Sequence, residues 1–178
     1  MKKRILLGTL IFLFGSLYNL SSYAENKNQF PKISGKNLEN KEYNLPSGFE
    51  GKINLVFIAF LRDQQKDIDK WLPLAKTLSK KYETLRYYEL PVLNETYARW
   101  FIDAGMKAGI SDKSQREKTI TIYTNKKKFL ESLDISNEKE IQILLLDSNG
   151  KIIWSDKGDF SKNKADSLQT ILSSKIEK

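Results

Sequence analysis

Short apolar runs alternate along the chain with amphipathic stretches, and this alternation predicts an α/β domain. The densest apolar run, INLVFIAF at residues 53–60, is typical of a strand that is buried on both faces of a sheet. From Asp63, a candidate N-cap, to about Tyr82, apolar residues such as Trp71 recur at three- and four-residue steps, which predicts a helix with one apolar face. Pro73 lies inside this predicted helix and is expected to kink it.

The other elements are predicted from the same periodicities, with Gly, Pro and Asn marking the turns. In chain order they are a short hairpin before residue 53, a strand at 85–92, a helix capped by Asn94 that ends near Gly105, a polar loop at 110–118, a strand at 119–124, a short helix capped by Asn125, a β-hairpin whose turn is Asp147 to Gly150, and a last helix from about Ser161.

The first residues of the chain have the pattern of a secretory signal peptide. A basic start at residues 2–4 precedes the apolar run Ile5 to Leu17, and Ser22 and Ala24 supply the small residues of a cleavage site. We therefore expect a signal peptide at 1–24, a mature domain at 25–178, and export to the periplasm or the medium. The alternative is an uncleaved membrane anchor, although the run is shorter than the ~20 residues that a span needs.

Composition excludes several kinds of chemistry. The chain has no Cys and no His, so it cannot supply a thiolate nucleophile, a redox pair, a Ser-His-Asp triad or an imidazole ligand. Its formal charge of +8 suits an anionic membrane surface, an acidic partner or simply a soluble basic protein. An exported protein does not meet a genome, so we expect no nucleic-acid partner.

The predicted order of elements resembles the thioredoxin superfamily, and the resemblance covers most of residues 30–176. The lead-in FPKISGKNLENKEYNLPSGFEGK is similar to that of exported thioredoxin-like and peroxiredoxin-like proteins. This resemblance implies a thioredoxin-like α/β fold, in which a central mixed sheet is flanked by helices. The chain would add an N-terminal hairpin extension and an extra strand–helix insertion at about 108–138.

Both redox hallmarks of the superfamily are missing. The proline in the first long helix is present as Pro73, and its spacing places the two cysteine positions of the family at Gln65 and Ile68. The position of the family's cis-proline falls at Ile141, where we expect a trans peptide bond. The resemblance therefore implies a thioredoxin-like domain that performs no thiol–disulfide chemistry of its own.

The C-terminal half resembles a more specific family, the thioredoxin-like assembly factor of the mitochondrial ATP synthase membrane sector. The similar pieces are TITIYTNKKKFLESL and ILLLDSNGKIIWSDKGD, together with Gln64, Gln65 and Trp71 after the central strand and Trp154 in the hairpin. That resemblance implies a chaperone-like role toward a membrane-protein subunit, and it transfers no catalytic residue.

Two short segments are candidate partner-binding sites. Gln64, Gln65, Lys66 and Ile68 lie at the start of a helix, where free backbone N–H groups could bind an anion or a partner carbonyl, and Lys126, Lys127 and Lys128 form the one dense basic cluster. The competing interpretations are a solvated first turn and a structural edge extension. Pro73, Ile141, Asp147 and Gly150 are predicted as structural hallmarks rather than contacts.

The sequence supports three hypotheses. The first is a redox-inactive protein that binds a protein partner at the cell envelope, with a membrane protein as one option, and that needs no cofactor or metal. The second is a cysteine-independent enzyme whose carboxylates, Asp63 and Asp67, converge in a groove beside the first long helix. The third is a docking subunit for a partner that supplies its own thiols.

Overall fold

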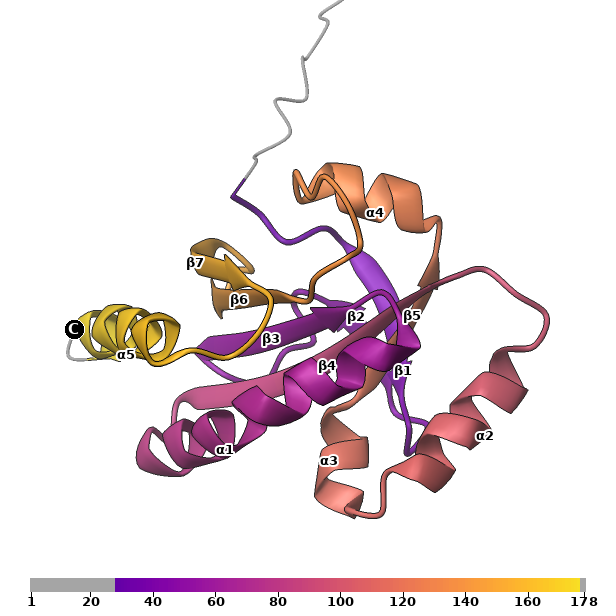
Figure 1. The fold of residues 1–178 in the computed structure, drawn as a ribbon, viewed down its shortest axis with the longest axis horizontal. Coiled ribbons are helices and arrows are strands. Elements are labelled where there is room, and N and C mark those ends of the chain that lie inside the picture. The colour runs from indigo at the N-terminus through magenta and orange to yellow at the C-terminus, as the bar shows by residue number, and fades with distance from the viewer. Residues whose placement is uncertain (1–27, 177–178) are drawn as a thin grey trace, which may run out of the picture.

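The computed structural model describes residues 28–176, and the predicted signal peptide lies outside them. Helices and strands alternate in the order that the sequence predicts (Figure 1). The elements are β1 (Ile33–Asn37), β2 (Glu42–Leu45), β3 (Ile53–Ala59), η1 (Arg62–Gln64), α1 (Gln65–Lys81), β4 (Leu85–Asn94), α2 (Arg99–Gly109), α3 (Lys113–Lys118), β5 (Ile120–Thr124), α4 (Lys126–Ser132), β6 (Gln142–Asp147), β7 (Ile152–Lys157) and α5 (Lys162–Ile176).

All strands belong to one seven-stranded sheet with the order β2-β1-β5-β4-β3-β6-β7. The centre is parallel, since β4 pairs in parallel with both β3 and β5. The hairpins β1–β2 and β6–β7 add antiparallel strands at the two edges. The sheet is therefore the predicted mixed sheet, with the N-terminal hairpin and the extra strand β5 in place.

Strand β3 contributes side chains to two hydrophobic cores, one on each face of the sheet, which explains its uninterrupted apolar run. Every one of its residues is buried. Leu55 and Phe57 join the core beneath α1 and α5, whereas Val56 and Ile58 join the core on the other face, which Phe129 of α4 completes. Burial of each such side chain contributes about 1.5–3 kcal/mol, so β3 anchors both layers of the domain.

The first long helix is held to the sheet by Trp71. Its indole is completely buried and donates a hydrogen bond from Nε1 to the carbonyl oxygen of Gly158 at 3.2 Å. Pro73 lies inside α1, as predicted. In the part of the chain from Asn28 to Ile176, no helix is both long enough and apolar enough to cross a membrane.

Three local predictions are wrong, and each has a physical reason. Asp63 is not the N-cap of α1, because a turn of 3-10 helix precedes α1 and places Gln64 at the cap. Asn94 does not cap α2, because β4 continues to Asn94, which pairs with Thr124 of β5; its Oδ1 instead accepts from the Lys126 amide at the start of α4 at 3.2 Å. The polar segment after α2 contains the short helix α3, whose first turn is capped by the Asp112 carboxylate.

The hairpin turn and the position of the missing cis-proline are as predicted. Gly150 adopts φ +79°, a conformation that favours glycine, and its amide donates to the carbonyl oxygen of Asp147 at 3.0 Å. The Asp147 carboxylate accepts from the backbone amides of Asn149 and Lys151, each at 2.9 Å, so it closes the turn from inside. Within residues 28–176 the cis peptide bond is Leu45–Pro46, and Ile141 is a buried residue with a trans bond.

Candidate functional site

The junction of β3 with α1 is the corner at which thioredoxin-like domains carry their thiols, and here a buried glutamine closes it. The side chain of Gln64 is only 3% exposed. Its Oε1 accepts from the backbone amides of Phe60 at 2.8 Å and Leu61 at 3.1 Å, and its Nε2 donates to the carbonyl oxygen of Glu138 at 2.7 Å. Gln64 therefore fastens the end of the central strand to the loop before β6.

Gln65, at the position of the first family cysteine, turns its amide toward the sheet. Its Nε2 donates to the Glu89 carboxylate on β4 at 2.9 Å and to Asp69 at 3.0 Å. Ile68, at the position of the second cysteine, is 1% exposed and belongs to the core beneath α1. The corner thus contains internal contacts where the superfamily places a reactive pair.

These placements correct part of the predicted contact set. Gln64 and Ile68 are buried, so neither side chain offers surface to a partner. Their role is structural, because one satisfies backbone groups and the other fills the core. Lys66 is exposed and Gln65 is half-buried, so only these two residues of the predicted corner remain accessible.

The buried carboxylate of Glu89 was not predicted. Glu89 is 1% exposed, and burial raises its pKa above the usual value, while hydrogen bonds from Gln65 and Gln115 oppose the rise. Its Oε1 atom has no hydrogen-bond partner. The available signal was an acid in the middle of the apolar strand LRYYELPV, although the sequence did not show that it would face the start of α1.

The structure shows no contact between the two carboxylates that the enzyme hypothesis requires. Asp67 forms an ion pair with Lys70 at 3.4 Å, and Asp63 is exposed. Asp69 accepts from Gln65 instead of joining them. Among residues 28–176 there is also no group of three or more acidic side chains arranged to hold a metal ion. The first turn of α1 therefore offers hydrogen-bonding groups and no converging acid–base pair.

A basic rim continues from this corner onto α4. Lys126 is partly buried, forms an ion pair with Glu138, and lies 3.4 Å from the carbonyl oxygen of Phe60. Lys127 and Lys128 are exposed. Beside them a pocket of about 510 Å³ opens at the ends of β4 and β5, and Asn94, Leu130 and Lys127 are among its lining residues. We refer to Lys66, Lys127 and Lys128, together with this pocket, as the basic rim.

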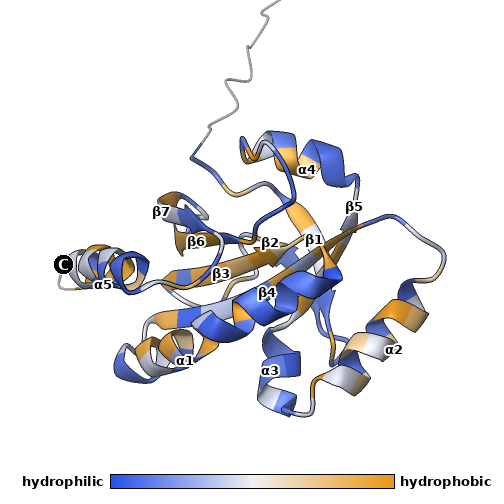
Figure 2. Cartoon of the chain, viewed as in Figure 1, coloured by the Kyte–Doolittle hydropathy of each residue, from blue (hydrophilic) through white to orange (hydrophobic). Residues whose placement is uncertain are grey.

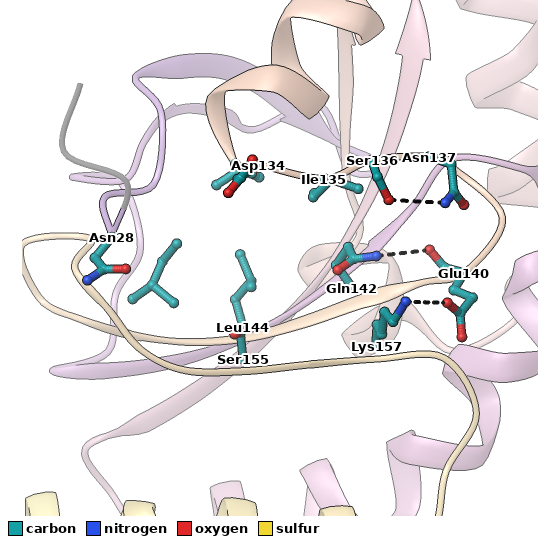
Figure 3. Close-up of a pocket in the computed structure, with 12 residues that line it drawn as sticks. Asn28, Asp134, Ile135, Ser136, Asn137, Glu140, Gln142, Leu144, Ser155 and Lys157 are labelled. Carbon is teal, nitrogen blue, oxygen red and sulfur yellow. Dashed lines mark hydrogen bonds and ion pairs between the residues drawn. The ribbon is translucent and has the colours of Figure 1, made fainter. Parts of the chain in front are cut away.

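A second pocket, of about 430 Å³, lies between the loop after α4 and the hairpin β6–β7 (Figure 3). Its side chains are mainly polar and satisfy one another: Lys157 pairs with Glu140 at 2.9 Å, and the Gln142 amide donates to the carbonyl oxygen of Glu140 at 3.3 Å. The pocket contains no pairing of a nucleophile with a base, so it does not suggest catalysis.

Helix α2 is attached to the domain by its polar face. The hydroxyl group of Tyr123 on β5 donates to the Asp103 carboxylate at 2.9 Å and to the carbonyl oxygen of Arg99 at 3.2 Å. The guanidinium of Arg99 lies over the Tyr123 ring, 4.9 Å from its centroid, and Lys107 pairs with Glu39 at 3.1 Å. The charged residues of α2 are therefore used within the molecule.

The bulky aromatic side chains at the start of α2 point to solvent, whereas Ile102 and Met106 are half-buried. No residue of this helix is buried. Trp100 is 74% and Phe101 68% exposed, and Tyr97, just before the helix, is fully exposed. Trp100 and Phe101 are adjacent in the sequence, and both are exposed. Figure 2 shows apolar residues along α2, which lies at the lower right of the view, away from α4 at the top.

Solved structures with the same fold include redox proteins and assembly proteins. Yeast Sco1 is 14% identical with a TM-score of 0.57, and the match covers 83% of this chain and 96% of that one. BsSco, of the Sco family of cytochrome c oxidase assembly proteins, is 15% identical with a TM-score of 0.55 over 82% and 92% of the two chains. The lipoprotein thioredoxin Etrx1 of Streptococcus pneumoniae is 17% identical with a TM-score of 0.53 over 80% and 99%. These likenesses confirm the thioredoxin-like fold.

Comparison with curated proteins finds no sequence relative. The family model described as ATP10 protein, however, matches residues 19–174. This match spans the whole described sheet, including the hairpin extension and the strand–helix unit of β5 and α4. It confirms the resemblance that the C-terminal motifs indicated. The chain therefore belongs to the ATP10 protein family, on a thioredoxin-like fold whose redox corner carries a glutamine and an isoleucine.

Proposed function

We propose that this protein is an exported, redox-inactive assembly factor that binds a protein partner at the cell envelope. The observation that carries the proposal is the combination of ATP10 family membership with a corner whose cysteine positions, Gln65 and Ile68, are used for internal contacts. A domain that keeps the fold and lacks the thiols retains binding as its available activity. By the family resemblance, the partner is a membrane-protein subunit on which the protein acts like a chaperone.

The basic rim is the surface that we assign to this partner. Lys127 lines an open pocket of about 510 Å³, Lys128 follows it on α4, and Lys66 is exposed in the first turn of α1. The pocket also offers the amide of Asn94 and the apolar side chain of Leu130, a mixture that suits a short peptide segment. The cationic side chains of the rim favour acidic or hydrogen-bond-accepting groups on this segment, and Glu95 and Glu138 in the pocket lining favour a hydrogen-bond donor beside them.

Site-specific photo-crosslinking in cells tests this assignment. A crosslinking residue at Lys66 and another at Lys127 should trap the same envelope protein, because the two positions flank one rim. The matched control is Lys162 on α5, which is as exposed as Lys127, with side chains 84% and 86% accessible. If the same products form at all three positions, or if Lys66 and Lys127 trap unrelated proteins, the rim is not the binding surface.

Export is part of the proposal and has its own measurement. The apolar run at residues 5–17 and the small residues at 22–24 support cleavage after Ala24. N-terminal sequencing of the protein recovered from the envelope fraction should therefore begin at Glu25. A protein that keeps its first residues and remains in the membrane would support the anchored alternative, and a full-length protein in the cytosol would refute export.

A further inference from the structure

The exposed side of α2 is apolar and carries side chains of uneven size, and its Trp100 and Ala104 also border an open pocket of about 740 Å³ beside β1 and β2. Bulky aromatic side chains lie at its beginning, on Tyr97, Trp100 and Phe101. Small residues follow on the same face at helical spacing: Ala104, Gly105 and Ala108, all exposed. The face therefore rises at the N-terminal end of the helix and is hollowed at the C-terminal end.

No packing contact within the domain requires glycine at positions 105 and 109 of this helix. Neither Gly105 nor Gly109 would meet any atom within 4 Å if it carried a Cβ. Glycine inside a helix is unfavourable compared with alanine, and here no close approach of another element of the chain requires it. Small residues on an exposed helix face do allow the backbone of a second helix to approach closely.

From these features we propose that α2 is a homodimer interface, in which the apolar face of α2 packs antiparallel against the same face of a second copy of this chain. A twofold axis perpendicular to the helix turns the raised half of one copy onto the hollow half of the other. Phe101 then lies over the partner copy's small residue at position 104, and Trp100 lies over position 105. A surface that complements itself under a twofold rotation is what an isologous dimer requires.

Charge and area agree with a second copy as the occupant. The ionic groups of α2 are paired within their own chain, Arg99 with Glu95 and Lys107 with Glu39, so the contact face brings no unpaired charge into the interface. Antiparallel packing also places the opposite ends of the two helix dipoles together. Three aromatic side chains from each copy would bury on the order of 1,000 Å², which is the low end for a specific interface and predicts a weak dimer.

Two other occupants fit less well. A helix that binds a bilayer surface usually combines aromatic side chains with unpaired Lys or Arg residues, and the cations of α2 are paired within the chain. The small residues in the hollow half would also add little apolar area to such binding. The first residues of the chain join the domain at Asn28, whose carbonyl oxygen accepts from Ile152 on the edge strand β7. Helix α2 is bound through Tyr123 of β5, on the other side of β4, β3 and β6. With the leader removed after Ala24, the few residues before Asn28 cannot reach it.

The first experiment measures self-association of the protein purified after export, by sedimentation velocity over a range of concentrations. We expect a monomer–dimer equilibrium with a dissociation constant of roughly 10–100 μM, as a small interface predicts. The decisive variant is Ala108→Trp, which adds apolar surface at an exposed position. It should weaken dimerisation at least tenfold by filling the hollow, whereas it would strengthen binding to lipid or to any unspecific apolar partner. A protein that stays monomeric at all concentrations, or a dimer that Ala108→Trp strengthens, would overturn the proposal.

The second experiment uses the absence of cysteine from the chain. In the proposed packing the two copies of position 104 lie beside the twofold axis, whereas the two copies of position 108 are about 16 Å apart along the helices, from a rise of 1.5 Å per residue. Ala104→Cys should therefore oxidise to a disulfide-linked dimer and Ala108→Cys should not. Equal crosslinking at both positions would indicate another arrangement and refute the antiparallel one. Because both residues are exposed, unchanged far-UV circular dichroism is expected for every variant.

Discussion

Replacement of Gln64 by leucine should destabilise the domain strongly. From the sequence alone, Gln64 resembles an exposed amide at the start of a helix, for which no such effect is expected. Leucine fills a similar volume and removes all the hydrogen bonds of the side chain. The backbone amide of Phe60 then loses its acceptor in a residue that is 2% exposed, which costs about 1–3 kcal/mol. The Leu61 amide and the Glu138 carbonyl group can turn to water, so their loss costs about 0.5–1.5 kcal/mol together. The expected total is roughly 2–4 kcal/mol.

Chemical and thermal unfolding measure this difference. For a domain of this size the loss corresponds to a melting temperature that is about 5–15 °C lower. Lys66→Ala, two positions along and exposed, is the matched control and should change the free energy of unfolding by no more than about 0.5 kcal/mol. If Gln64→Leu unfolds like this control, the amide does not fasten β3 to the loop before β6, and the structural role assigned to the corner is refuted.

The remaining predictions concern the buried acid and the attachment of α2. Burial raises the pKa of Glu89, so the native state binds the carboxyl proton more tightly than the unfolded chain does. The protonated group therefore contributes stability fully below the unfolded pKa of 4.5, and this contribution is lost as the pH rises through the pKa of the folded state. In urea unfolding between about pH 4 and pH 8, Glu89→Gln should gain stability over the wild type as the pH rises, by about 1.4 kcal/mol for each unit of pKa elevation, and a constant difference would contradict this. Tyr123→Phe removes the hydroxyl group that donates to the Arg99 carbonyl oxygen and to the Asp103 carboxylate. Hydrogen exchange of the backbone amides in α2 should then accelerate roughly 5–10-fold, while exchange in α5 stays unchanged. Equal protection of α2 in the wild type and the variant would show that other contacts hold this helix.

Local patterns predicted the elements whose burial is continuous or strictly periodic. The run at 53–60 became β3, the three- and four-residue spacing around Trp71 became α1, and the turn at Asp147 to Gly150 became the β6–β7 hairpin. In each case the residues that decide the structure are neighbours in sequence. The thiol-free state of the corner could also be predicted, since it depends on residue identity alone.

Contacts between distant parts of the chain could not be predicted in the same way. The Gln65 amide reaches Glu89, and the Gln64 amide reaches Glu138, so the sequence correctly placed these glutamines at the corner but assigned them to the surface. An Asn shortly after a proline predicts a helix cap, but pairing of Asn94 with Thr124 of β5 prolongs β4 past Pro91. Helix α3 has no apolar stripe, and its polar sequence therefore resembled a loop.

The pairing of the strands also has a consequence for the order in which the chain can fold. Besides its hairpin partner β2, strand β1 pairs with the distant strand β5, where Lys36 lies opposite Thr121. In the same way, Ile53 of the central strand lies opposite Asp147 of β6. Such a high contact order slows folding, because long loops must close before their contacts can stabilise the structure. A chain delivered N-terminus first cannot complete these pairings until β5 (Ile120–Thr124) and then β6 (Gln142–Asp147) have arrived. If the protein is exported as we propose, its sheet can be completed only after most of the chain has crossed the membrane.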